Sequence, residues 1–175
     1  MSRIHIFYSS THGQAMKICK AIADELSQAG HQAQLQALDE FDGDFSQIDK
    51  LLIGASIYHG RHNPAVFAFV DKYRQQLESI PNAFFSVNLV ARKPEKNTAE
   101  TNPYMQQFLS KSGWQPSLCS VFGGKINYPS YNFFDRNIIR FIMWMTKGPT
   151  NKDAVIEYTD WSKVRDFAHQ LARLA

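Results

Sequence analysis

Two short, nearly uninterrupted apolar runs constrain the fold of this 175-residue chain more than any other feature. They are Lys50 to Ser56 (KLLIGAS) and Ala83 to Ala91 (AFFSVNLVA). Such runs are typical of strands that are covered on both faces, as in a parallel sheet between two layers of helices. A third segment, Gln32 to Leu38, alternates Gln with Ala and Leu, which predicts a half-exposed strand at an edge of the sheet.

Helical patterns lie between the predicted strands. Apolar residues recur at helical spacing after the strand at Ile4 to Tyr8, and Gly30 is expected to end that helix. Asn-Pro pairs at 63–64 and 102–103 predict the starts of two more helices, the strand Leu118 to Gly123 follows, and a last helix starts near Asp160. This alternation predicts an α/β fold with a doubly wound, five-stranded parallel sheet in the order 2-1-3-4-5, and a ligand at the carboxyl ends of strands one, three and four.

The turn after the first predicted strand has the composition of an anion-binding loop. The sequence Ser9 to Gln14 (SSTHGQ) combines hydroxyl groups with the free backbone amides and positive dipole of a helix N-terminus. It lacks the Lys of a nucleoside triphosphate loop and the three glycines of a dinucleotide fingerprint, which favours a single phosphate. An ordinary helix cap with the same residues is the alternative.

Two further loops are expected beside this turn because their strands end at the same edge. Strand three delivers Ser56 to His62 (SIYHGRH), in which Tyr58 offers an aromatic plane and Gly60 permits close backbone approach. Strand four delivers Asn88 to Arg92 (NLVAR). A flat ring could lie between these loops, and the alternative is that Tyr58 and His59 are surface turn residues.

Charge and composition narrow the function classes. The segment from Val90 to Lys152 holds nine Lys and Arg residues against three acidic ones, a local net charge of +6, which predicts an anionic partner there. No nucleic-acid reader motif accompanies this charge, so nucleic-acid binding is not expected. Cys19 and Cys119 lack the spacing of a metal site or disulfide framework, and no signal peptide is recognised, which predicts a reducing, cytoplasmic compartment.

A segment from about 127 to 150 is predicted to be a late insertion in one domain spanning 1–175, because it is long for a connection in a small α/β domain. Phe134, Ile138, Phe141 and Met145 recur at helical spacing, and basic residues lie on the opposite side. This pattern, with Trp144 on its flank, is typical of a helix lying in the surface of an anionic membrane. We predict that residues 128 to 147 form a lid that contacts the membrane. Packing on the core or contact within a homo-oligomer is the alternative.

The turn and the strand order closely resemble flavodoxins, whose first loop binds the phosphate of FMN. Ala15 stands where those proteins commonly have a closing Thr. The resemblance implies a flavodoxin-like fold with FMN as cofactor. The residues implied to hold FMN come from all three loops, namely Ser9, Ser10, Thr11, His12, Gly13 and Gln14 at the phosphate, Ser56, Ile57, Tyr58, His59 and Gly60 at the isoalloxazine, and Asn88 and Leu89 at its polar edge.

A closer resemblance within that superfamily rests on GASIYHGRHNPA, FFSVNLVARKPEKNTAETNPY, the YP-x-Y-x-x-x-D-R segment and EYTDW. These segments are similar to the bacterial quinone-dependent protoporphyrinogen oxidases over essentially the whole chain. The resemblance implies oxidation of protoporphyrinogen IX to protoporphyrin IX in haem biosynthesis, with electrons passed to menaquinone or ubiquinone. It places the protein peripherally on the cytoplasmic face of the inner membrane.

Porphyrinogen carries propionates, so Arg92, Lys93, Arg136 and Arg140 are candidate substrate-binding residues. His59 and His62 are candidates for a general base, although solvent could accept the proton instead. Two other functions remain open at this point, an NAD(P)H:quinone reductase and a non-enzymatic electron-carrier flavodoxin. Such carriers are usually acidic, whereas the isoelectric point of this sequence is about 8.8.

Overall fold

Five parallel strands form the central sheet of the computed structural model, which describes all 175 residues. Their order is β2-β1-β3-β5-β6, which confirms the predicted order 2-1-3-4-5 when these five strands are counted along the chain. Their bounds are β1 (Arg3–Ser9), β2 (Gln32–Ala37), β3 (Lys50–Tyr58), β5 (Asn82–Asn88) and β6 (Leu118–Gly123). The two predicted apolar runs are indeed the central strands β3 and β5.

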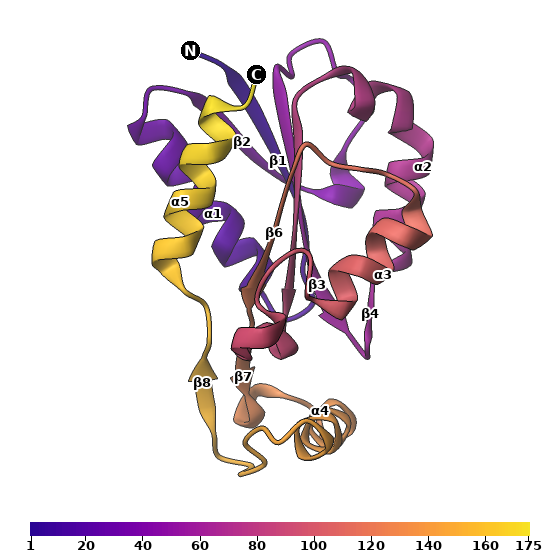
Figure 1. Cartoon of the computed structure of the whole chain (residues 1–175), viewed down its shortest axis with the longest axis vertical. Helices are drawn as coiled ribbons and strands as arrows, with labels where there is room; N and C mark the ends of the chain where they lie inside the picture. Colours follow the sequence, from indigo (N-terminus) through magenta and orange to yellow (C-terminus); the bar gives the residue numbers. More distant parts are fainter.

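Helices cover both faces of the sheet. Helices α1 (Gln14–Gln28) and α5 (Trp161–Arg173) lie on one face, and α2 (Pro64–Ser79) and α3 (Pro103–Ser112) on the other (Figure 1). Each face has its own core of buried side chains: Ile18, Ile22 and Phe167 pack with Phe85 on the first. Phe7, Phe84, Phe108 and Trp114 belong to the second. Because both faces are buried, the carboxyl ends of the strands remain as the place for a site.

The predicted helix starts are formed by side-chain caps. Asn63 accepts a hydrogen bond from the amide of Ala65, and Asn102 accepts from the amides of Tyr104 and Met105. Asp160 caps α5 in the same way. Gly113 ends α3 with a φ of 66°, a left-handed conformation that glycine adopts readily.

The strand predicted over Ala83 to Ala91 is shorter than expected. It ends at Asn88, because the Asn88 side chain accepts a hydrogen bond from the amide of Ala91 and turns Leu89–Arg92 into a 3-10 helix. Strand β4 (Arg61–His62), which was not predicted, pairs with the end of β3 as an antiparallel hairpin. Two more single turns of 3-10 helix are Leu38–Glu40 and Pro94–Lys96.

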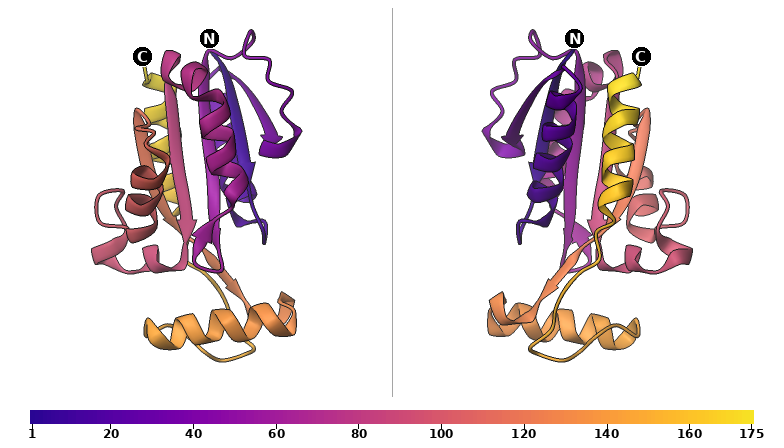
Figure 2. Two further views of the ribbon diagram at one scale, coloured as in Figure 1. Left: turned by 90° about the vertical axis from the view of Figure 1, so that its right-hand side faces the viewer. Right: turned by 90° about the vertical axis from the view of Figure 1, so that its left-hand side faces the viewer.

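The predicted insertion lies below the carboxyl ends of the strands. It begins with β7 (Lys125–Asn127), continues through a 3-10 turn at Tyr128–Ser130 and α4 (Phe133–Met145), and returns through β8 (Val155–Glu157). Figure 2 shows α4 lying across the end of the sheet. Strands β7 and β8 were not predicted, and the helix starts later than 128 because Asn132 caps it at the amide of Asp135.

The insertion has a small core of its own. Ile126, Tyr128, Tyr131 and Met143 are buried together, and the Tyr128 hydroxyl donates to the carbonyl of Pro149 at 2.7 Å. This core fixes α4 within the insertion, and Leu89, which follows β5, packs against it. No helix in the structure has both the length and the apolar character needed to cross a membrane.

Candidate functional site

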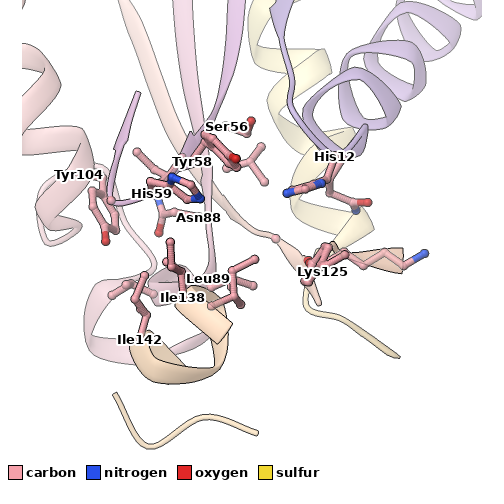
Figure 3. A pocket seen from close by; sticks show the side chains of 18 residues that line it. His12, Ser56, Tyr58, His59, Asn88, Leu89, Tyr104, Lys125, Ile138 and Ile142 are labelled. Atoms are coloured by element: carbon pink, nitrogen blue, oxygen red, sulfur yellow. The ribbon is translucent and has the colours of Figure 1, made fainter. Parts of the chain in front are cut away.

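A pocket opens where the three loops predicted from the sequence meet the insertion. The loops that follow β1, β3 and β5 form its polar wall, and α4 closes it from below (Figure 3). Its lining is His12, Gln14, Ser56, Ile57, Tyr58, His59, Gly60, Val87, Asn88, Leu89, Val90, Tyr104, Gly124, Lys125, Tyr131, Ile138, Ile139 and Ile142. Nine of the thirteen residues predicted to hold FMN are in this lining, while Ser9, Ser10, Thr11 and Gly13 form the turn beside it.

The turn between β1 and α1 retains the features of an anion site. Gly13 is the residue before the helix and has a φ of 90°, and its amide donates to the Ser10 hydroxyl oxygen at 3.0 Å. The next three amides, from Gln14 to Met16, open the helix and have no carbonyl one turn back. The first turn of α1 carries no acidic side chain. These donors fit a phosphate group.

Gln14 links this turn to the last part of the chain. Its amide nitrogen donates to the Thr159 hydroxyl at 2.9 Å and to Glu157 at 3.2 Å, and Thr159 donates to the carbonyl of Gly123. A hydrogen bond from Lys17 is the largest of the effects that lower the pKa of Glu157. The phosphate turn is therefore fixed to the segment that leads from the insertion into α5.

The hairpin between β3 and β4 forms the centre of the polar wall. Its two turn residues, His59 and Gly60, have φ values of 49° and 78°, as a tight two-residue hairpin turn requires. The Tyr58 and His59 rings are stacked with their centres 3.8 Å apart. Both residues line the pocket and contact the insertion. His59 is also an exposed turn residue, as the alternative from the sequence has it, so contact of these two residues with FMN stays a prediction.

Asp135 of α4, which was not among the predicted site residues, makes that contact. Its Oδ1 accepts hydrogen bonds from the Tyr58 hydroxyl at 2.8 Å and from Nε2 of His59 at 2.9 Å. Burial raises the pKa of this carboxyl, but the hydrogen bonds from Tyr58 and His59 outweigh burial and hold the pKa below its ordinary value. The insertion is thus joined to the hairpin through an ionised carboxylate.

A buried polar network supports the third loop. His62 Nε2 lies 2.8 Å from the Ser86 hydroxyl, and the Asn88 amide donates to the same hydroxyl at 3.1 Å. The Asn102 amide donates to Asn88 at 2.9 Å, so the cap of α3 also holds the strand end at the pocket. His62 is 2% exposed and is absent from the pocket lining, which leaves His59 as the predicted candidate base that faces the pocket.

The four basic residues predicted to bind substrate lie near the insertion, and none of them lines the pocket. Arg92 donates to the carbonyls of Leu89 and Thr146, and Arg136 donates to the carbonyl of Tyr131. Arg140 donates through Nε to the carbonyl of Thr150, while its two terminal nitrogens make no hydrogen bond with the protein. Lys93 is half-buried and also makes no side-chain hydrogen bond. Their role in substrate binding stays a prediction.

Helix α4 presents two apolar surfaces. Ile138, Ile139 and Ile142 line the pocket, and Figure 3 shows Ile138 and Ile142 rising towards the loops. The second surface faces solvent, and we call it the aromatic stripe: Phe133, Phe134, Phe141, Trp144 and Met145, between 56% and 81% exposed. The alternative that the predicted apolar face packs on the core is wrong for Phe134, Phe141 and Met145.

Comparison with known proteins agrees with this geometry. Residues 5–153 match the flavodoxin domain family. The chain is 41% identical over 170 residues to a protein of Escherichia coli K12 named protoporphyrinogen IX dehydrogenase [quinone], covering 97% of this chain and 94% of that protein. It is 43% identical over 172 residues to a protein of the same name from Leishmania major, covering 97% and 74%.

Among solved structures, a flavodoxin of Streptococcus pneumoniae TIGR4 has a TM-score of 0.55 and 14% identity, covering 98% of each chain. This structural similarity supports the fold, and the sequence identities support the narrower group. The chain therefore belongs to the flavodoxin domain family and, within it, to the family of the quinone-dependent protoporphyrinogen IX dehydrogenases.

Proposed function

We propose that this protein oxidises protoporphyrinogen IX to protoporphyrin IX, with FMN as its cofactor and menaquinone or ubiquinone as electron acceptor. One observation carries the proposal beyond family membership: the loops of a flavin site and the apolar face of the insertion form a single pocket. A carrier flavodoxin needs no such cover. A porphyrinogen that must react next to a flavin needs a large, mostly apolar and partly enclosed place.

The residues of the pocket fit FMN. The amides that open α1 and the hydroxyls of Ser9, Ser10 and Thr11 would hold the phosphate. The segment Ser56 to Gly60 and the strand end at Asn88 and Leu89 would flank the isoalloxazine. Bound FMN supplies the two-electron redox chemistry that no side chain of this protein can provide.

The protein's own side chains shield the reacting groups and accept a proton. Ile138, Ile139 and Ile142 exclude water from the lower side of the pocket. His59 lies in the polar wall and is the candidate base, because its Nδ1 makes no hydrogen bond with the protein. Each two-electron oxidation of the substrate releases two protons, of which one accompanies the electron pair and the other needs an acceptor.

The propionates of the substrate need cationic partners near the pocket mouth. Arg140 and Lys93 keep donors free of protein acceptors, which favours them among the four candidates. Arg92 and Arg136 donate to backbone carbonyls of the insertion and its neighbouring turn, so we assign them mainly to holding the lid in place.

The aromatic stripe supports peripheral attachment to the cytoplasmic face of the inner membrane. Five exposed large apolar side chains on one helix form a surface that suits the boundary between lipid headgroups and acyl chains. The net charge of +6 between Val90 and Lys152 favours an anionic membrane as the occupant. The quinone resides in that membrane, so the same contact brings the acceptor to the pocket.

The decisive experiment reconstitutes the purified protein with FMN and follows porphyrin fluorescence from protoporphyrinogen IX without oxygen. Fluorescence should appear on addition of a short-chain menaquinone or ubiquinone and stay at the uncatalysed level without quinone or without protein. The same samples are then mixed with NADH or NADPH. Rapid flavin bleaching by a nicotinamide together with no porphyrin formation would replace this proposal with a quinone reductase, and failure of both reactions would favour an electron carrier.

A further inference from the structure

Asp135 supplies a carboxylate directly behind the wall of the pocket. None of the residues that line the pocket is Asp or Glu. The Asp135 side chain lies just behind them, is 7% exposed, and uses Oδ1 for both Tyr58 and His59. Its other oxygen, Oδ2, faces the Asn132 amide at 3.3 Å. Its carboxylate is therefore engaged on both oxygens by groups that favour the charged form.

The hairpin that Asp135 holds is conformationally demanding. His59 occupies the first turn position with a φ of 49°, where Asn, Asp or Gly is usual. A side chain other than Gly in this region costs about 1 kcal/mol or more, and the surrounding structure must offset that cost. The hydrogen bond from His59 Nε2 to Asp135 and the stacking of His59 on Tyr58 supply the offset. The His59 ring is therefore held by the insertion through Asp135 and by its own hairpin through Tyr58.

We infer that Asp135 is a positioning residue for the proposed oxidation. This inference rests on the proposed function: the carboxylate accepts a hydrogen bond from the Nε2–H of His59, so the lone pair that accepts the substrate proton is on Nδ1. The charge of Asp135 then stabilises the imidazolium until the proton passes to water. Bound FMN would supply the acceptor for the electron pair and one proton, and His59 takes the second proton, so protons and electrons balance.

The same contact makes the insertion part of the catalytic arrangement. Asp135 and Tyr58 are 77 residues apart, and Asp135 lies on the helix whose isoleucines close the pocket. The helix therefore cannot sit on the pocket without also orienting His59. His59 is therefore oriented to accept a proton only while α4 covers the pocket.

The first test uses the full-length protein without cofactor, so that it does not depend on turnover. Hydrogen exchange of the backbone amides between 57 and 61 is compared in the wild type, Asp135→Asn and Asn137→Ala, the last a control at an exposed residue of the same helix. We expect Asp135→Asn to speed exchange of the hairpin by about tenfold, because it removes a charge-assisted hydrogen bond, and Asn137→Ala to leave it unchanged.

The second test measures turnover of the FMN-loaded variants with protoporphyrinogen IX and quinone. Asp135→Asn should lower kcat by about 100-fold, in the range of a lost general base, while KM changes by less than about threefold. A purely structural role would instead lower the amount of folded, FMN-binding protein and leave kcat per bound flavin unchanged. Visible circular dichroism of the bound flavin counts the loaded sites.

The outcomes separate this inference from the proposed function. Wild-type kcat per flavin in Asp135→Asn overturns the inference, and so does unchanged hairpin exchange. Absence of porphyrin formation by the wild-type protein overturns the proposed function, and in that case the exchange experiment alone decides whether Asp135 positions the hairpin.

Discussion

The imidazole of His62 and the hydroxyl of Ser86 lie 2.8 Å apart, in a site where Ser86 is fully buried and His62 is 2% exposed. The rings of Phe84 and Phe108 each make an edge-to-face contact with the imidazole. Burial lowers the pKa of His62 to about 4, so the ring is neutral in the folded protein near neutral pH. The uncharged imidazole of His62 therefore stabilises the end of β5 next to the pocket.

Stability should fall below neutral pH because of His62. The unfolded chain binds a proton near the ordinary histidine pKa of about 6.5, whereas the folded protein binds one only near pH 4. The free energy of unfolding is thus highest above pH 6.5 and decreases as the pH falls towards 4, with about 2 kcal/mol lost between pH 7 and pH 5. Urea unfolding at the two pH values measures this loss. In His62→Gln the difference should shrink by most of that amount, and an unchanged difference would assign it to other groups.

Gly54 should tolerate no side chain. A Cβ at this position would lie 2.3 Å from Cζ of Phe85 and 2.7 Å from Sγ of Cys19, in the centre of the sheet. Gly54→Ala should therefore destabilise the protein by about 2 to 3 kcal/mol through overpacking. Chemical denaturation measures the effect, and Gly124→Ala is the matched control, since its Cβ would make an ordinary contact at 3.5 Å. Equal stability of the two variants would contradict the prediction.

Asn102 should matter for both folding and cofactor binding. It is completely buried, caps α3 at two amides, and donates to Asn88 and to the carbonyl of Lys96. Asn102→Ala leaves several of these groups unpaired and should cost about 3 kcal/mol of unfolding free energy. Because Asn88 lines the pocket, FMN affinity measured by flavin fluorescence should also decrease. Asn63→Ala removes a cap whose side chain makes no hydrogen bond with the Asn88 network, so it should destabilise the protein without changing FMN affinity.

The sheet and its caps could be predicted because their signals are local. The apolar runs of β3 and β5 and the Asn-Pro pairs before α2 and α3 act within a few residues of the structure that they determine. The predicted end of β5 lay three residues beyond the observed one, because Leu89, Val90 and Ala91 continue the apolar run. In the structure, Leu89 and Val90 line the pocket and Ala91 packs in the neighbouring core. Hydropathy alone does not distinguish these two uses.

The parts of the site that sequence reasoning missed depend on contacts between distant segments. Asp135 meets Tyr58 across 77 residues, and nothing in the local sequence of either residue indicates the other. Strands β7 and β8 have three residues each, too few for a periodic pattern. The net charge of +6 between Val90 and Lys152 was evident from the sequence, but the carbonyls that engage Arg92 and Arg136 appear only once the chain is folded. The YP-x-Y-x-x-x-D-R segment, which contains Asp135, was the available signal.

The aromatic stripe should bind anionic membranes. The triple variant Phe133→Ser, Phe141→Ser, Trp144→Ser removes exposed apolar area, so it should leave stability nearly unchanged and reduce co-sedimentation with phosphatidylglycerol vesicles by about tenfold or more. A matched control, Met16→Ser with Val155→Ser, changes exposed apolar residues outside α4. Neutral phosphatidylcholine vesicles and high salt should both weaken wild-type binding. If the triple variant binds vesicles as well as the wild type does, the aromatic stripe is not the membrane-binding surface.

Arg140 should contribute to substrate affinity more than Arg92 does. The terminal nitrogens of Arg140 make no hydrogen bond with the protein, whereas both terminal nitrogens of Arg92 donate to protein carbonyls. Arg140→Gln should raise KM for protoporphyrinogen IX about fivefold, which corresponds to about 1 kcal/mol for a partly exposed charge pair, with kcat little changed. Arg92→Gln should instead increase proteolysis near Thr146, because it releases that end of α4. Steady-state kinetics and limited proteolysis on both variants distinguish these roles, and a larger KM effect at Arg92 would reverse the assignment.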